Sequence, residues 1–302
     1  MNDLVASHGN VRDAASPLDI HPVAGAIGAE IRGIRLTARM DPAEVAAIRA
    51  ALVRHKVVFF RGQSGFDKRS LGDFAALLGP PYKHPTVPGA GDASVTALEA
   101  QEGYSASTWH TDVTFVAAYP RFTILCGVAM PAAGGDTLWA STAAAYEGLP
   151  DELKRLADGL WAYHDNRFDY AADGAVIGES GYRKAFASVF FQTEHPLVHV
   201  HPESGERNLI GGLYLKRFAG FDESDSANLR RIFQDHVTRP ENTVRWRWTA
   251  GDVAIWDNAA TQHRAIADFG LQRRSLLRAT AGAITPVSID GRPSRILTEV
   301  KG

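Results

Sequence analysis

The segment Trp109-His110-Thr111-Asp112-Val113-Thr114-Phe115 places an imidazole and a carboxylate two residues apart in an apolar, β-branched run. Because residues i and i+2 of a β-strand point to the same face, a strand here would direct His110 and Asp112 toward one point. Two such ligands and a distant histidine form the two-histidine, one-carboxylate set that leaves open positions on a non-haem Fe(II) ion. The segment therefore predicts a strand that carries two ligands of a metal site.

The third ligand and two arginines are expected further along the chain. His263 follows an expected strand whose end can face the same cavity as His110. Arg274 and Arg278 are separated by an even offset, so a strand places both on one face. Two inward arginines in an apolar strand are costly unless each meets an anion, and a guanidinium suits a carboxylate or a sulfate. Thr137, just after a Gly-Gly-Asp turn, can add a hydroxyl donor to one of these anions.

The composition is that of an ordinary globular protein of 302 residues, with 45% hydrophobic residues, 22% charged residues and a formal net charge of −2. A chain of this length can bury a sizeable core. The chain contains no block of like charges of the kind that would indicate binding to nucleic acid or to a membrane surface. No apolar segment approaches the ~20 residues that span a bilayer. We therefore expect neither nucleic-acid nor membrane binding.

The N-terminal segment and the single cysteine give further expectations. Residues 1–17 are small and polar and lack the apolar core of a signal peptide, so we expect a flexible tail on a cytoplasmic protein. No repeat or linker divides residues 18–302, which are expected to form a single domain. Cys126 excludes an intrachain disulfide framework and, in its apolar run, is expected to be a buried, inert thiol.

Short strands outnumber helices in the expected element order. One helix should begin at Asp41 as its N-cap, with Pro42 in the first turn and Glu44 at the third helical position. Other helices are expected over 71–78 and 225–236, and residues 142–160 are expected to be mostly helical. Strands are expected within 20–36 and over 57–60, 121–128, 197–200, 243–248, 253–256 and 274–281. Residues 166–193 read as an irregular functional loop. The pattern predicts a mainly β protein with flanking helices (α+β) around a double-sheet jelly-roll core.

Several motifs occur in the order found in a known family. They are Trp109-His110-Thr111-Asp112-Val113-Thr114-Phe115, Gly134-Gly135-Asp136-Thr137-Leu138-Trp139, His195-Pro196-Leu197-Val198 with His201-Pro202, Trp246-Arg247-Trp248, Ile255-Trp256-Asp257-Asn258 with Thr261-Gln262-His263, and Arg273-Arg274. In these motifs, and over essentially residues 20–282, the chain resembles the taurine dioxygenase family of Fe(II)/2-oxoglutarate-dependent dioxygenases.

The resemblance implies a double-stranded β-helix fold and a role for each matching residue. It implies Fe(II) as cofactor, 2-oxoglutarate and O2 as co-substrates, a small anionic organic substrate, and a homo-oligomer that is a dimer or a tetramer. The implied iron ligands are His110, Asp112 and His263, and the implied 2-oxoglutarate contacts are Thr137 and Arg274. The implied substrate contacts are Arg278 and His84 at the anionic head, with Val113 and Phe115 beside them.

Two departures bear on the substrate. Taurine-specific members are similar to one another in a tyrosine and an asparagine at positions where this chain has Val87 and Ala106. These changes remove polar contacts for a short zwitterion, and the chain most resembles alkylsulfatase-type members. The resemblance then implies hydroxylation of the carbon next to the anionic group of an alkyl sulfate ester, with release of aldehyde, sulfate, succinate and CO2. The segments 89–107 and 166–193 are expected to close over the site.

Other interpretations stay open at this point. The same chemistry can serve a sulfonate, an aryloxyalkanoate, an N-acyl amino acid or a secondary metabolite. A zinc hydrolase can use the same three ligands with a metal-bound water, and a non-catalytic jelly-roll sensor can bind a metal and an anion. Arg274 can instead serve a core ion pair, and His84 a loop hydrogen bond. His195, His199 and His201 mix strand faces, which favours structural roles over a second metal site.

Overall fold

The computed structural model describes residues 10–11, 14–86, 95–100, 106–167 and 189–301. The helices are α1 (Pro42–His55), α2 (Lys68–Leu78), α3 (Thr142–Glu147), α4 (Asp151–Gly159) and α6 (Glu223–Val237), with a 3₁₀ turn η1 (Pro240–Asn242). The strands are β1 (Asp19–Pro22), β2 (Ala29–Arg32), β3 (Val57–Phe60), β4 (Val95–Ala100), β5 (Tyr119–Ala129), β6 (Thr137–Ser141), β7 (Trp161–Asp165), β8 (Val189–Pro196), β9 (Val198–Val200), β10 (Arg207–Leu209), β11 (Leu215–Phe218), β12 (Thr243–Trp246), β13 (Val253–Asp257), β14 (Thr261–Ala265), β15 (Arg274–Ile284) and β16 (Arg295–Lys301).

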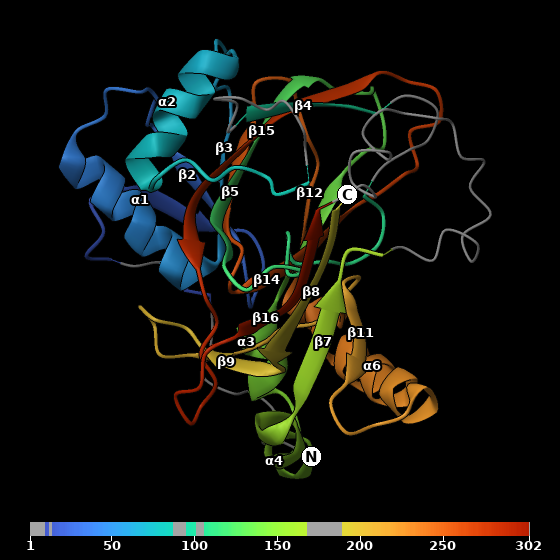
Figure 1. Ribbon diagram of the computed structural model, residues 1–302. Coiled ribbons are helices and arrows are strands. Elements are labelled where there is room, and N and C mark those ends of the chain that lie inside the picture. Colours follow the sequence, from blue (N-terminus) through green and yellow to red (C-terminus); the bar gives the residue numbers. More distant parts are fainter. Residues whose placement is uncertain (1–9, 12–13, 87–94, 101–105, 168–188, 302) are drawn as a thin grey trace.

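These strands form four sheets, and the described part of the protein is mainly β with helices outside the sheets (Figure 1). The largest sheet has the order β1-β2-β3-β13-β5-β15-β4, and only the β2–β3 pair in it is parallel. The other sheets have the orders β12-β6-β14, β11-β7-β8-β16 and β10-β9. The mainly β prediction with flanking helices is therefore confirmed.

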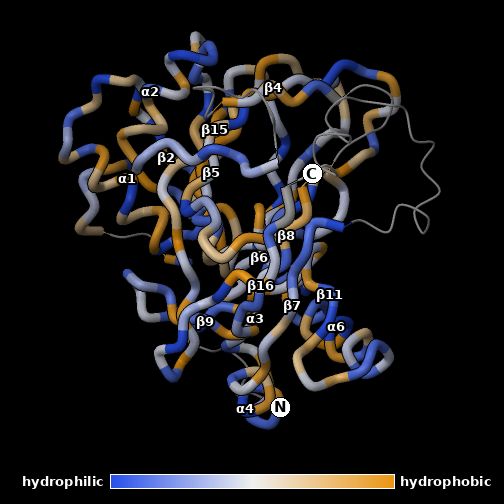
Figure 2. Tube along the Cα trace, viewed as in Figure 1, coloured by the Kyte–Doolittle hydropathy of each residue, from blue (hydrophilic) through white to orange (hydrophobic). Residues whose placement is uncertain are grey.

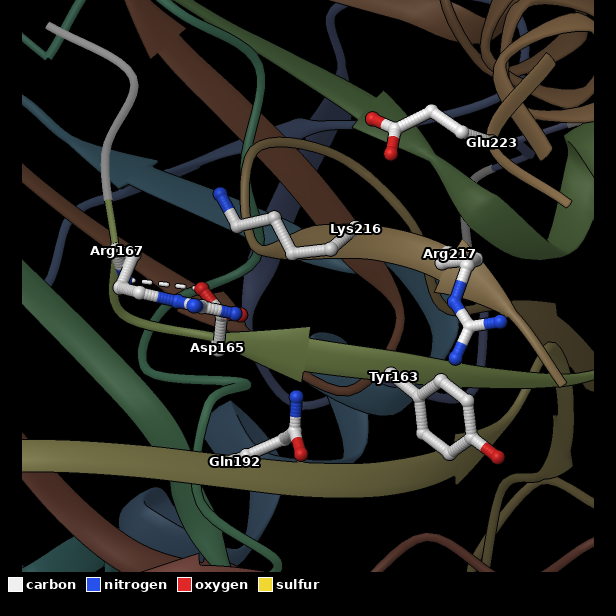
Figure 3. Close-up of a pocket in the computed structure, with 7 residues that line it drawn as sticks. All are labelled: Tyr163, Asp165, Arg167, Gln192, Lys216, Arg217 and Glu223. Atoms are coloured by element: carbon white, nitrogen blue, oxygen red, sulfur yellow. Dashed lines mark hydrogen bonds and ion pairs between the residues drawn. The ribbon is translucent and has the colours of Figure 1, made fainter. Parts of the chain in front are cut away.

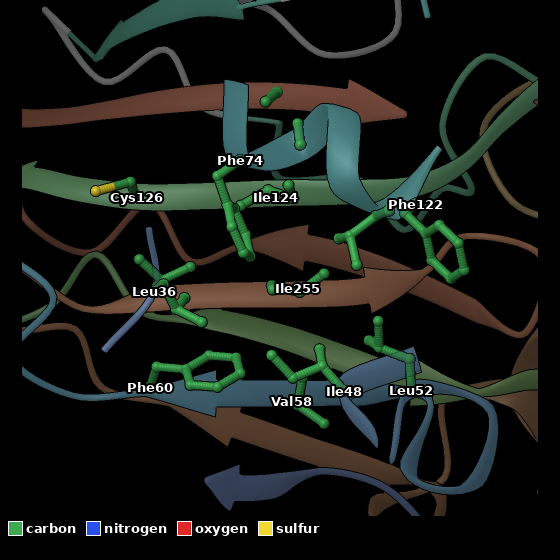
Figure 4. Close-up of a cluster of buried hydrophobic side chains, with 14 of the residues drawn as sticks. Leu36, Ile48, Leu52, Val58, Phe60, Phe74, Phe122, Ile124, Cys126 and Ile255 are labelled. Atoms are coloured by element: carbon green, nitrogen blue, oxygen red, sulfur yellow. The ribbon is translucent and has the colours of Figure 1, made fainter. Parts of the chain in front are cut away.

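Helices α1 and α2 cover one face of the seven-stranded sheet (Figure 4). Ile48 and Leu52 of α1 and Phe74 of α2 pack against sheet residues such as Ile124 and Ile255. Helix α1 begins as predicted, because the Asp41 side chain accepts a hydrogen bond from the Ala43 backbone N–H and Glu44 completes the capping box. Cys126 is buried in the same cluster, as predicted. This packing holds the sheet that carries much of the site.

The opposite face of the same sheet packs against the three-stranded sheet. Alternate residues of the central strands, such as Phe59, Trp256 and Leu276, contact Trp139 and Trp246 of the smaller sheet. Phe59 stacks on Trp246 with ring centroids 4.1 Å apart, and Trp139 meets Trp256 edge to face at 5.6 Å. Both faces of the central strands are thus apolar, and hydrophobic residues concentrate around β5 and β15 (Figure 2).

A third cluster joins α3, α4 and α6 to the strands around β7, β9 and β11. The mostly helical segment expected over 142–160 is confirmed as two helices, α3 and α4, separated by Gly148-Leu149-Pro150. Proline has no backbone N–H for a helical hydrogen bond and disfavours helical geometry in the residue before it, so a new helix begins after Pro150.

The expected loop over 166–193 and the expected N-terminal tail are only partly described. Residues 168–188 and Val87 lie outside the described residues, as do 1–9 and 12–13. Residues 189–193, expected to be irregular, belong instead to β8, which pairs with β7 and with β16. Asn10 donates hydrogen bonds to the carbonyls of Ala24 (2.8 Å) and Gly28 (2.7 Å).

Within the described ranges, no helix combines the length and the apolar character that crossing a membrane requires.

Replacing Ile255 by alanine tests the core in which β13 is packed. Ile255 is fully buried at the centre of the seven-stranded sheet. We expect the Ile255→Ala variant to lose about 2–5 kcal/mol of unfolding free energy in urea denaturation, because the lost methyl groups leave a cavity. Leu271, which is 90% exposed, provides the control, and its alanine variant should stay within about 0.5 kcal/mol of wild type. Equal losses in the two variants would contradict this packing.

Candidate metal centre

Three side chains from distant parts of the chain meet between the two sheets. His110, Asp112 and His263 each place one ligand atom within 4.8 Å of the others, and all three residues are buried. They are the one such group of histidine, cysteine, aspartate and glutamate found in the described ranges. The sequence predicted this set, and the structure brings all three members together.

The way in which His110 and Asp112 converge differs from the prediction. His110 lies in no strand and forms isolated antiparallel bridges with His263 and Gly212; the backbones of His110 and His263 are joined by hydrogen bonds of 3.0 and 2.8 Å. Asp112 to Phe115 then form a turn, with Val113 at φ 62°, a left-handed conformation that β-branched residues rarely adopt. The predicted strand over this segment is therefore wrong, and a turn rather than strand alternation directs Asp112 toward His110.

A buried asparagine explains the turn. The Asn258 side chain accepts a hydrogen bond from the Asp112 backbone N–H (2.9 Å) and donates to the Asp112 carbonyl (3.1 Å). It also donates to the carbonyl of Pro120 (2.9 Å). Since these side-chain bonds occupy the backbone groups of Asp112 that a strand neighbour would use, the chain does not continue as a strand. They also offset the strain at Val113.

The hydrogen bond of His110 and the burial of His263 suit metal binding. His110 Nδ1 lies 2.8 Å from the carbonyl of Thr108, which places the proton on Nδ1 and leaves the Nε2 lone pair available. His110 Nε2 and His263 Nε2 lie 3.6 and 3.9 Å from Asp112 Oδ1. Burial holds the pKa of His263 well below its usual range, so its imidazole is neutral.

Asp112 is ionised, as a carboxylate ligand of a metal must be. Burial by itself would raise the pKa of this carboxyl, but the nearby Arg278 and the two imidazoles outweigh burial and hold the pKa well below its usual range. Arg278 Nη2 lies 2.9 Å from Asp112 Oδ1, and the Thr123 hydroxyl donates to Asp112 Oδ2 at 3.0 Å. Two imidazoles and one carboxylate form a nitrogen and oxygen donor set that fits a divalent transition-metal ion such as Fe(II).

Arg274 and Thr137 lie together, as the sequence predicted. Arg274 donates to the carbonyl of Gly135 (2.8 Å) and to the Thr137 hydroxyl (3.3 Å), and burial lowers the pKa of Arg274 to about 10. Trp248 also donates to this hydroxyl at 2.9 Å, so the hydroxyl accepts twice and its own proton can be donated to a ligand. A Cβ on Gly135 would come within 3.0 Å of the Arg274 side chain, which explains the glycine at this turn.

The second arginine lies on the same face of β15, as its even offset predicted. Leu276 shares a face of β15 with the two arginines and belongs to the core between the sheets. Its neighbour Leu277 lies on the other face, in the cluster under α1 and α2. The sequence predicted that each inward arginine meets an anion. For Arg278 the structure provides the Asp112 carboxylate, so its guanidinium is held beside the metal cluster.

The remaining predicted substrate contacts lie next to this cluster. Burial, followed by the charge of Arg278, lowers the pKa of His84 to about 4, so this imidazole is neutral near pH 7. The His84 ring lies 6.2 Å from that of Phe115, and Phe115 contacts Tyr214 at 5.0 Å between ring centroids. Val113 and Phe115 belong to one buried apolar cluster.

The other histidines that invited a second metal site bind protein groups instead. His195 lies 2.7 Å from both Ser294 Oγ and the carbonyl of Thr114. His199 Nε2 lies 2.7 Å from a backbone carbonyl, and His201 Nε2 lies 2.9 Å from Asp257 Oδ2. These contacts agree with the structural roles expected for the three residues.

Gly212 supports the metal centre and was not assigned from the sequence. It forms an antiparallel bridge with His110, and its φ is 84°. A Cβ at Gly212 would lie 2.7 Å from the carbonyl oxygen of Trp109 and 3.0 Å from the Cα of His110. Only glycine allows so close an approach in this conformation. The Gly-Gly pair at 211–212 was the available signal, but a glycine pair also marks ordinary turns.

A separate pocket of about 530 Å³ is lined by Tyr163, Asp165, Arg167, Gln192, Lys216, Arg217 and Glu223 (Figure 3). It contains charges of both signs, and Asp165 is paired with Arg167 at 2.7 Å. None of its lining residues is a predicted site residue, so we place the chemistry at the metal cluster.

Comparison with known proteins agrees with this geometry. Residues 19–280 match the family described as taurine catabolism dioxygenase TauD, TfdA family. The chain is 55% identical over 287 residues to an alpha-ketoglutarate-dependent sulfate ester dioxygenase from Pseudomonas putida, which covers 93% of this chain and 95% of the relative. It is 47% identical over 280 residues to an alkylsulfatase from Acinetobacter baylyi, with 91% and 88% covered.

A solved structure also shares the fold. The crystal structure of a taurine dioxygenase from Burkholderia xenovorans superposes with a TM-score of 0.75 at 40% identity, and covers 93% of this chain and 95% of that one. The chain belongs to the TauD/TfdA dioxygenase family.

The close approach at Gly212 can be tested with a matched glycine. We expect the Gly212→Ala variant to lose more than about 1 kcal/mol of stability, because alanine at a positive φ is strained and its Cβ meets the Trp109 carbonyl. Gly205 has φ 72°, and no described atom lies within 4 Å of the place that a Cβ would take, so Gly205→Ala carries only the backbone strain. Urea denaturation and Mn(II) affinity measure both variants. Equal effects of the two changes on both readouts would contradict the role of Gly212.

Proposed function

We propose that this protein is an Fe(II)- and 2-oxoglutarate-dependent dioxygenase that cleaves alkyl sulfate esters oxidatively. One observation carries the proposal: the buried His110, Asp112 and His263 cluster has the half-buried Arg278 against Asp112, and the same face of β15 carries the buried Arg274, as a metal with two anionic reactants requires. The substrate class is supported by the relatives named sulfate ester dioxygenase and alkylsulfatase. The products are an aldehyde, inorganic sulfate, succinate and CO2.

His110, Asp112 and His263 would hold the iron. When bound, Fe(II) supplies the activation of O2 and the oxidation of a substrate C–H bond. Asp112 would reach the metal from the turn and the two histidines from the adjacent bridge. The burial of all three residues keeps bulk water away from the reacting atoms.

Arg274 and Thr137 would bind the far carboxylate of 2-oxoglutarate. The Arg274 guanidinium is oriented by its bond to the Gly135 carbonyl, and the Thr137 hydroxyl retains a proton for the carboxylate. With a pKa of about 10, Arg274 is cationic at neutral pH. A charged and oriented donor pair of this kind fixes both the position and the rotation of a bound carboxylate.

Arg278 and His84 would bind the sulfate head of the substrate. The Arg278 fork donates to sulfate oxygens, and the neutral His84 can donate one N–H without adding charge. Val113 and Phe115 provide apolar surface beside this head for the alkyl chain. A sulfate head held by these residues would let position, rather than acid-base strength, select which hydrogen is removed.

The product then decomposes by ordinary chemistry. The hydroxylated carbon carries both a new hydroxyl group and the sulfate ester oxygen. When the hydroxyl loses its proton, the electron pair forms the aldehyde C=O bond, and the carbon–oxygen bond to sulfate breaks. Inorganic sulfate leaves with both electrons of that bond, so the atoms and electrons balance without any further reactant.

We also propose a double-stranded β-helix core within a single domain over residues 18–302. The seven-stranded and three-stranded sheets face each other across one apolar layer, and the site lies between them, which supports this architecture. By the same family resemblance we propose that the protein forms a homo-oligomer, a dimer or a tetramer.

Turnover in air tests the proposed reaction against its alternatives. Iron-reconstituted protein is given 2-oxoglutarate with a medium-chain alkyl sulfate, taurine or an aryloxyalkanoate, and succinate, aldehyde and sulfate are measured. We expect equal amounts of the three products with the alkyl sulfate only, and none from Asp112→Ala. Sulfate release without 2-oxoglutarate or O2 would indicate a zinc hydrolase instead. Metal binding without turnover of any substrate would indicate a sensor.

The two arginines should separate by reactant. Replacing Arg274 with lysine removes the planar fork, so we expect the KM for 2-oxoglutarate to rise roughly 10- to 100-fold, as the loss of a charged hydrogen bond predicts. Replacing Arg278 with lysine should raise the KM for the alkyl sulfate by a similar factor. Each variant serves as the other's control. A rise in the same KM in both variants would contradict the assignment.

A further inference from the structure

The two carboxylate oxygens of Asp112 have different neighbours. Oδ1 faces the two imidazoles and lies 2.9 Å from Arg278 Nη2. Oδ2 points the other way and accepts a hydrogen bond of 3.0 Å from the Thr123 hydroxyl. A ligand carboxylate carries no proton, so the hydroxyl is the donor in this bond. One oxygen is thus directed to the metal position, and the other is occupied by the protein.

Thr123 is held firmly where it makes this bond. It lies in β5, between β13 and β15, with Trp256 and Thr280 as its cross-strand partners. Its neighbours Phe122 and Ile124 point to the opposite face, into the cluster under α1 and α2 (Figure 4). Thr123 itself is 0% exposed. The hydroxyl therefore cannot follow the carboxylate if Asp112 rotates.

Packing alone does not account for a threonine at this position. Valine has nearly the same shape and an equal preference for strands, and it would bury no polar atom in this apolar strand. A buried hydroxyl is tolerated here because Asp112 accepts its hydrogen bond. The backbone of Asp112 is already fixed by Asn258, so rotation of the side chain is the freedom that Thr123 removes.

We propose that Thr123 is a positioning residue that makes Asp112 a single-oxygen ligand and so keeps one metal position open. The inference rests on the proposed metal centre. Three single-atom ligands leave about three positions on a six-coordinate ion, which suffice for a chelating 2-oxo acid and O2. If Asp112 bound through both oxygens, it would take the last of these positions. Without the Thr123 hydroxyl, Oδ2 loses its partner, and metal binding becomes the way to satisfy it.

Water bound to Mn(II) in the full-length protein tests this role without any turnover. The paramagnetic relaxation of solvent protons reports how many exchangeable waters remain on the ion. We expect Thr123→Val to lower the relaxivity of bound Mn(II) to about two thirds of the wild-type value, as about three waters become two. Thr123→Ala, which also lacks the hydroxyl, should behave in the same way, and Thr123→Ser should restore the wild-type value.

A neighbouring threonine provides the matched control. Thr280 is the cross-strand partner of Thr123, is also buried, and donates its hydroxyl to the carbonyl of Tyr82 at 3.0 Å. Thr280→Val removes a buried threonine hydrogen bond, to a neutral carbonyl, from the same sheet, so it should lose some thermal stability but keep the wild-type relaxivity. Turnover of the alkyl sulfate should fall roughly 10- to 100-fold in Thr123→Val, as for other groups that orient a metal ligand.

The possible outcomes distinguish the role of Thr123 from the existence of the metal centre itself. Wild-type relaxivity in both Thr123→Val and Thr123→Ala overturns the inference and leaves the metal centre intact. An equal fall in Thr280→Val also overturns it, because loosening of the sheet would then explain the effect. A wild-type protein that binds no Mn(II) overturns the metal centre itself, and the inference with it. A fall confined to the two Thr123 variants, with recovery in Thr123→Ser, supports the assignment.

Discussion

The site depends on the hydrogen bonds between the Asn258 side chain and the backbone of Asp112. They join two segments 146 residues apart and turn the chain after His110, so that a carboxylate and an imidazole two residues apart reach one point. A buried ion pair at the preceding residue, Asp257, helps to hold Asn258 in place. Arg121 donates to Asp257 at 2.8 Å, and His201 lies 2.9 Å from the same carboxylate. Removing one partner of such a pair would leave an uncompensated buried charge next to the turn.

The sheets explain how so polar a site can exist inside an apolar molecule. β5, β13 and β15 are apolar on both faces and pack under the helices on one side and against the smaller sheet on the other. Among the polar residues on these strands, Thr123, Arg274 and Arg278 share the face of Leu125 and Leu276 in the layer between the sheets, and each has a charged or hydrogen-bonding partner. The packing therefore holds the strands in place, and the strands hold the hydrogen-bonding and charged side chains in position. The site can thus keep its geometry before any reactant binds.

Sequence patterns predicted the local features well. The cap of α1, the burial of Cys126 and the common face of Arg274 and Arg278 all follow from the period of one helix or one strand. Sequence patterns were less successful for elements whose secondary structure depends on contacts with residues distant in the chain. Strand β16 was missed because its pairing with β8 depends on a strand far away in the chain.

The sequence by itself determined which groups are available for chemistry, because the types and order of His110, Asp112, His263, Arg274 and Thr137 predict a metal donor set and an anion site. Tertiary structure alone decided how these groups meet. A strand was predicted at His110, but the Asn258 amide competes for the backbone of Asp112 and produces a turn. In the same way, Thr123 reads as one residue of an apolar run until folding brings its hydroxyl to the Asp112 carboxylate. Side-chain hydrogen bonds between segments so far apart leave no periodic trace in the sequence, so only the folded chain shows them.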